Sequence, residues 1–108
     1  MQHLARVILA GVLMTGAGEA RAYNLMGNGI VSCGTWTVDR QHDRAATLEQ
    51  WVFGFLSGIG YWGAAQASNP LNGMDAEGVF VWIDNYCRTH PISQLVEAAG
   101  AFNAAHPR

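Results

Sequence analysis

The chain has 108 residues, of which 50% are hydrophobic and only 13% are charged, and its formal net charge at pH 7 is −2. It contains no lysine, and its few arginines could not line a basic groove. The composition therefore excludes a nucleic-acid-binding surface of the usual kind.

The N-terminal segment has the pattern of a secretory signal. Arg6 precedes an apolar run over 7–14, which is too short to span a bilayer. The tripeptide 20–22, Ala-Arg-Ala, has the small residues that a signal peptidase accepts. We expect cleavage after Ala22 and export to the periplasm.

Residues 23–108 should then form a single small domain with its core at about 32–104 and no membrane span. Cys33 and Cys87 are its two cysteines. In an oxidising compartment such a pair favours a disulfide. This bond would close a loop of about 55 residues and contribute about 4 kcal/mol. A metal pair or a catalytic thiol is disfavoured, because the cysteines lack C-x-x-C spacing.

The segment 31–38 alternates weakly and fits either a short strand or a helical turn capped by Ser32. The polar stretch 39–46 is expected to be an exposed connection. The sequence Thr47-Leu-Glu-Gln resembles a capping box and predicts a helix from there to about Ala67.

Glycines interrupt this predicted helix at a cost of about 1 kcal/mol each. Gly54, Gly58, Tyr61 and Ala65 would share a small face that another backbone approaches closely.

A second helix is predicted after Asp75, as its N-cap, and Pro91 ends it or opens the next. On this helix Asp84 is expected to pair with Arg88 four residues later. A third helix should extend from Ser93 to about residue 105. The expected fold class is therefore all-α: a small bundle of three main helices plus a short N-terminal segment, held by one disulfide.

Several landmarks occur in a familiar order. They are Ser-Cys33-Gly-Thr-Trp, Trp51-Val-x-Gly-x-x-x-Gly58-x-x-Tyr61, Trp82-Ile-Asp-Asn-Tyr86-Cys87-Arg-x-x-Pro91 and Leu95-x-x-Ala98-x-x-x-Phe102. Over roughly 32–102 the chain resembles the HdeA/HdeB family of small periplasmic acid-stress chaperones, and HdeB in particular. A looser resemblance is to the Rap1a/Tai immunity proteins, which neutralise secreted cell-wall amidases and usually carry more cysteines.

The HdeA/HdeB resemblance implies a helical homodimer near neutral pH that loosens in acid and binds unfolding client proteins. The family is rich in lysine, whereas this chain has none. With every carboxylate of 23–108 protonated, its arginines, histidines and N-terminus would still carry a charge of about +8, enough to drive acid expansion. The immunity-protein alternative implies one specific periplasmic partner instead.

The candidate site residues follow from this interpretation. Tyr61, Trp62 and Trp36 are candidates for a partner or dimer surface. His42, His90 and Asp84 are candidates for a pH response. The sequence shows no nucleophile–base pairing, metal-ligand cluster or phosphate-binding loop, so we expect a protein that is not an enzyme and needs no cofactor.

Overall fold

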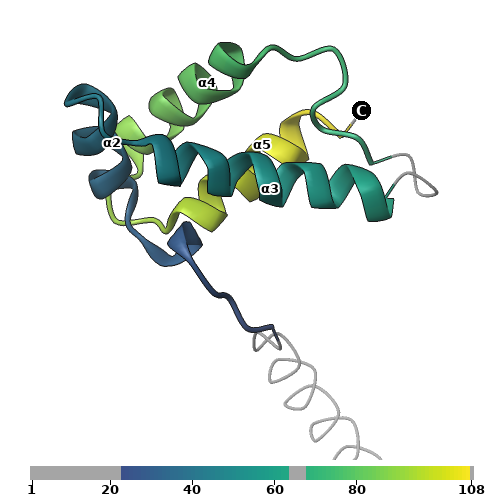
Figure 1. Ribbon diagram of the computed structural model, residues 1–108, viewed down its shortest axis with the longest axis horizontal. Helices are drawn as coiled ribbons and strands as arrows, with labels where there is room; N and C mark the ends of the chain where they lie inside the picture. The colour runs from purple at the N-terminus through teal and green to yellow at the C-terminus, as the bar shows by residue number, and fades with distance from the viewer. Residues whose placement is uncertain (1–22, 64–67, 108) are drawn as a thin grey trace, which may run out of the picture.

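Four α-helices follow a short helical turn in the computed structural model, which describes residues 23–63 and 68–107. The elements are η1 (Asn28–Ile30), α2 (Cys33–Gln41), α3 (Ala46–Gly63), α4 (Ala76–Thr89) and α5 (Leu95–Ala105) (Figure 1). An isolated bridge joins Ser32 to Gln94, and the described part of the chain has no strand. The predicted all-α class is confirmed, with four helices rather than three. The expected signal segment, 1–22, lies outside the described residues.

The segment around Cys33, for which the sequence allows a strand or a helical turn, forms the helix α2. Oγ of Ser32 accepts a hydrogen bond from the Thr35 backbone N–H at 3.1 Å and caps its start. The helix continues through 39–41, so the prediction of an exposed connection there was wrong. The reason is that Trp36, one turn from the start, is buried and holds the helix against the core.

The helix α3 begins at Ala46, one residue before the predicted cap. Thr47 therefore lies inside the first turn, and its assignment as N-cap was wrong. The Glu49 backbone N–H donates to the carbonyl of Ala45 at 2.8 Å, so Ala45 is the residue that opens the helix. Ala45 is buried, so tertiary packing rather than the local capping preference decides where the helix begins. The predicted end near Ala67 lies outside the described residues.

The next two helices begin close to their predicted positions. Asp75 precedes α4 as the N-cap, although its side chain makes no capping hydrogen bond. The helix α5 begins at Leu95, two residues later than predicted. A Glu97 carboxylate oxygen accepts the Gln94 backbone N–H at 2.7 Å, which fixes Gln94 as the N-cap.

The core lies between the helices and draws on all four of them. Figure 1 shows α5 crossing behind α3, with α4 above and α2 at the end of the bundle. The largest fully buried hydrophobic side chains are Trp36, Phe102, Leu56, Ile83, Leu95, Val52 and Val79. No helix of the described ranges has both the length and the apolar character needed to cross a membrane.

The predicted close approach at the glycine face of α3 was wrong for its described members. A Cβ added at Gly54 or Gly58 would meet nothing within 4 Å. A close approach occurs instead at Gly29, against which the Trp51 indole packs. The Trp51 Nε1–H also donates to the carbonyl of Met26 at 3.3 Å. Trp51 therefore fastens the segment before α2 to α3.

This packing predicts opposite effects for alanine at two glycines. Gly29→Ala places a methyl group on the indole ring of Trp51 and should lower the free energy of unfolding by about 1–3 kcal/mol. Gly54→Ala, exposed within α3, should raise it by about 0.5–1 kcal/mol through helix propensity. Urea denaturation measures both. Equal effects at the two positions would show that Trp51 does not hold the N-terminal segment.

Candidate functional site

Arg40, in the last turn of α2, binds carboxylates from two other helices. Its Nη1 donates to Glu49 of α3 at 3.0 Å, and its Nη2 donates to Glu77 of α4 at 3.0 Å. Asp84 of α4 accepts from Nε at 3.0 Å and from Nη2 at 2.8 Å, which makes a two-point ion pair. We call these four residues the Arg40 cluster. Through it one cation joins three helices.

The cluster lies directly on the aromatic core. The Trp36 Nε1–H donates to Oδ1 of Asp84 at 2.8 Å. The guanidinium carbon of Arg40 lies 5.8 Å from the Trp36 ring centroid and 5.4 Å from that of Phe80, within range of a cation–π attraction. The Arg40 and Asp84 side chains keep 19% and 31% exposure. The pair is therefore shielded enough to be stronger than an ordinary surface salt bridge.

The surrounding carboxylates also fix the charge of Arg40. The hydrogen bond to Asp84 raises the pKa of Arg40 well above its usual range, and those to Glu77 and Glu49 act in the same direction. Burial lowers the pKa of Arg40, but by less than these contacts raise it. The guanidinium therefore stays protonated across the whole physiological pH range.

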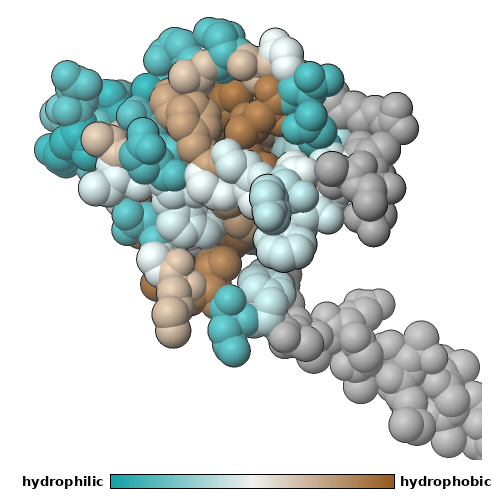
Figure 2. All heavy atoms as spheres, turned by 45° about the vertical axis from the view of Figure 1, so that its right-hand side comes forward, coloured by the Kyte–Doolittle hydropathy of each residue, from teal (hydrophilic) through white to brown (hydrophobic). Residues whose placement is uncertain are grey.

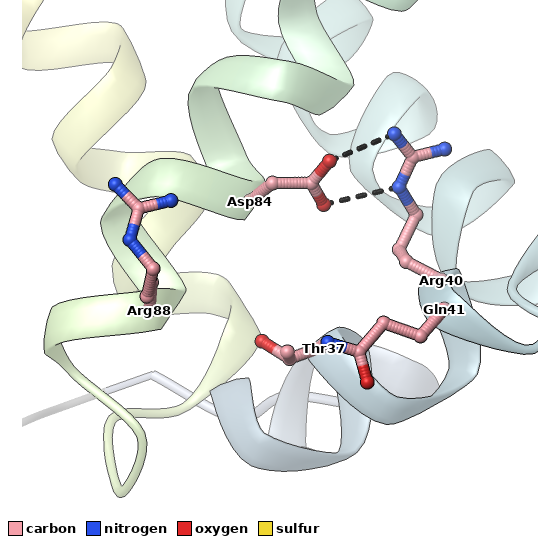
Figure 3. Close-up of a pocket in the computed structure, with 5 residues that line it drawn as sticks. All are labelled: Thr37, Arg40, Gln41, Asp84 and Arg88. Carbon is pink, nitrogen blue, oxygen red and sulfur yellow. Dashed lines mark hydrogen bonds and ion pairs between the residues drawn. The ribbon is translucent and has the colours of Figure 1, made fainter.

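A cavity of about 350 Å³ opens beside the ion pair, between α2 and α4. Its lining residues are Thr37, Arg40, Gln41, Asp84 and Arg88 (Figure 3). Figure 3 shows Asp84 and Arg40 facing each other along one side of this cavity. The Asp84 carboxylate already accepts three hydrogen bonds. The arrangement is thus suited to holding helices together, and the described residues contain no group of His, Cys, Asp or Glu that could hold a metal ion.

The predicted disulfide between Cys33 and Cys87 is confirmed. Its sulfur atoms are 2.08 Å apart, and the bond joins the first residue of α2 to α4. Trp36 follows Cys33 by three residues, and Asp84 precedes Cys87 by three. The covalent bond and the Trp36–Asp84 hydrogen bond therefore join neighbouring turns of the same two helices.

The three predicted surface aromatic residues have different environments. Tyr61 and Trp62 are 76% and 81% exposed, and their rings meet edge to face with centroids 5.0 Å apart. Trp36 is completely buried, so its assignment to a partner surface was wrong. The reason is that its indole fills the core while its N–H is bound by Asp84.

The three predicted pH-responsive residues do not form one site. Asp84 belongs to the Arg40 cluster, whereas His42 and His90 lie exposed at the ends of α2 and α4. The expected pair between Asp84 and Arg88 was wrong. Asp84 instead binds Arg40 on another helix, and Arg88 donates to a neighbouring asparagine at 2.7 Å.

Sequence reasoning missed Arg40, Glu49 and Glu77 as members of the site. Arg40 lies in a stretch with the polarity of a loop, and the two glutamates have the pattern of solvated first-turn residues. The spacing of Cys33, Trp36 and Arg40, at three and four residues, was the available signal. On a helix these residues share one face.

The Arg40 cluster predicts unequal effects for two arginine substitutions. Arg40→Met keeps much of the aliphatic bulk but leaves Asp84 without its cation, and should lower the free energy of unfolding by about 2 kcal/mol. Arg44→Met removes an exposed pair with Asp39 and should lower it by less than about 1 kcal/mol. Urea denaturation at neutral pH separates the two. Similar losses would show that the cluster is no stronger than a surface contact.

The comparisons with known proteins add no relative. The chain matches no protein-family model, no curated protein and no solved structure. The resemblance to the HdeA/HdeB family therefore depends on the sequence motifs alone and remains a hypothesis.

Proposed function

We propose that this chain is a non-enzymatic periplasmic protein of the HdeA/HdeB type that loosens in acid and binds unfolding proteins. The Arg40 cluster is the observation that carries this proposal. It holds three helices together through one cation, and every anionic partner of that cation can be neutralised by protons.

Acid acts on the carboxylate side of the cluster. The raised pKa of Arg40 means that its own ionisation favours the folded state at low and neutral pH, and this contribution is lost only in strong alkali. When Glu49, Glu77 and Asp84 are protonated, they no longer compensate the guanidinium. A largely shielded cation is then left without a counter-charge, which costs free energy.

Loosening at this point would expose the core. Trp36 and Phe80 lie under the guanidinium, and both are buried in the packed fold. The disulfide from Cys33 to Cys87 does not titrate and keeps α2 beside α4 while the ion pair opens. The protein would therefore expand locally rather than unfold completely, which offers apolar surface to a client.

Apolar side chains already reach the surface before any loosening. Figure 2 shows hydrophobic side chains gathered on one face, bordered by hydrophilic ones. Tyr61 and Trp62 add two exposed aromatic rings at the end of α3. A client-binding surface could be built outward from such side chains.

The exposed pair of Tyr61 and Trp62 also favours a second candidate function. Adjacent exposed aromatic residues are typical anchors of a specific protein interface. An immunity-like protein would bind one partner at neutral pH through them. Tyr61→Ala with Trp62→Ala would then abolish that binding and leave unchanged the pH at which the protein loosens.

The acid response is tested with the disulfide-bonded protein, titrated from pH 7 to pH 2. Sedimentation, binding of a hydrophobic dye and suppression of client aggregation are read together. We expect all three to change over the same pH range. A protein that stays compact and protects no client throughout the titration would contradict the proposal.

Two variants assign the response to the Arg40 cluster. Asp84→Asn mimics the protonated side chain and should move the onset of dye binding to higher pH. Asp39→Asn removes the exposed partner of Arg44 and should leave the onset unchanged. An unchanged onset in both variants would show that the cluster does not set the acid response.

A further inference from the structure

Three of the four helices in the described ranges end on a histidine. Each is the C-cap residue of its helix, and its ring nitrogen Nδ1 lies 2.8–3.0 Å from the backbone oxygen four residues earlier. The pairs are His42 with Val38 in α2, His90 with Tyr86 in α4 and His106 with Phe102 in α5. One arrangement therefore recurs at three separate helix ends.

This geometry fixes where the proton of each neutral ring lies. A carbonyl oxygen can only accept a hydrogen bond, so Nδ1 must be the donor and Nε2 is left without a proton. At His90 a second group agrees. The Thr89 hydroxyl donates to the same Tyr86 carbonyl at 3.2 Å, and its oxygen lies 3.0 Å from Nδ1 of His90, where it can only accept.

The three carbonyls differ in their backbone donors: those of Val38 and Phe102 also accept the backbone N–H of the same histidine, at 3.1 and 2.9 Å, whereas that of Tyr86 does not. The last carbonyls of any helix have no partner in the next turn. The His90 backbone N–H bonds to Cys87 at 3.2 Å, so its imidazole supplies a donor that the Tyr86 carbonyl lacks from the backbone. The rings also stack on the preceding turn, with centroids 4.0 Å apart for Tyr86–His90 and 4.3 Å for Phe102–His106.

We propose that these three histidines are pH-dependent helix caps that strengthen the fold when their imidazole rings are protonated. Protonation adds a proton at Nε2 and leaves the Nδ1–H bond in place. It also puts a positive charge at the negative end of each helix dipole and, in α4 and α5, over an aromatic ring. Each effect favours the folded state.

The three histidine rings make no ion pairs in the described ranges, so we expect their charge to act on the helix ends. Charged neighbours along the chain are Arg40, Asp43 and the Asp39–Arg44 pair near His42, Arg88 near His90, and Arg108 near His106. His106 packs against the uncharged ring of Trp82 from α4. In the segment after α3, the backbone N–H of Asn69, an uncharged residue, donates to the carbonyl of Pro107, which follows His106.

The sign of this response is opposite to that of the Arg40 cluster. Protonation of the histidines would tighten the fold. Protonation of the cluster carboxylates would open the cluster. The inference about the caps does not depend on the proposed chaperone activity, because it concerns stability alone.

The proton position is tested first, on the full disulfide-bonded chain at pH 8. Long-range ¹⁵N–¹H NMR correlations distinguish the two neutral tautomers of each ring. We expect the Nδ1–H form at His42, His90 and His106. The Nε2–H form, which predominates in free histidine, would overturn the proposal at any ring that shows it.

The stability response is then measured by urea denaturation at pH 8 and pH 5.5. The wild-type folding equilibrium constant should rise about tenfold or more, because each cap contributes about a two- to fivefold gain on a separate helix. The triple variant His42→Gln, His90→Gln, His106→Gln should lose this rise. Ser57→His, which adds an exposed imidazole in the middle of α3, should keep the wild-type rise without enlarging it. An equal rise in the wild type and the triple variant, or no rise in the wild type, would overturn the proposal.

Discussion

The two-point ion pair between Arg40 and Asp84 is the interaction on which the arrangement of the helices depends. It joins residues 44 positions apart, and the same guanidinium reaches Glu49 and Glu77. Because its carboxylate also accepts the Trp36 N–H, the ion pair and the aromatic core cannot move independently. A change in the charge of Arg40 or Asp84 would therefore disturb the packing of Trp36 in the core.

The disulfide and the helix caps set limits on what that charge change can do. Cys33–Cys87 holds α2 and α4 together at a neighbouring turn, whatever the pH. As proposed, the histidine caps, built on the bonds to Val38, Tyr86 and Phe102, would favour the folded helices when protonated, while the Arg40 cluster would open only when its carboxylates are neutralised. Together the two proposals describe a small domain that would resist a moderate fall in pH and open locally in a severe one. Such a response suits the proposed role in acid stress.

Local sequence patterns predict much of this fold, and long-range contacts account for what they miss. The apolar periodicity of α3 and α4 and the cysteine pair are visible in the sequence because each is a local or compositional signal. The length of α2 is harder to predict, since Arg40 belongs to a polar stretch in which only its spacing from Cys33 and Trp36 indicates an inward face. Had the disulfide been combined with helical spacing, it would have placed Trp36 beside Asp84, each three residues from a bonded cysteine. The exposure of Tyr61 and Trp62 was predicted from the sequence and is confirmed, and other apolar residues fill the inward face of α3.

A double-mutant cycle on Arg40 and Asp84 tests the central claim most directly. The free energy of unfolding is measured at neutral pH for the wild type, Arg40→Met, Asp84→Asn and the double variant, with a matched cycle on Arg44 and Asp39. The account predicts a coupling energy of about 2 kcal/mol for the first pair and less than about 0.5 kcal/mol for the second. Additive effects at Arg40 and Asp84 would contradict it, because the ion pair would then contribute nothing beyond its separate side chains.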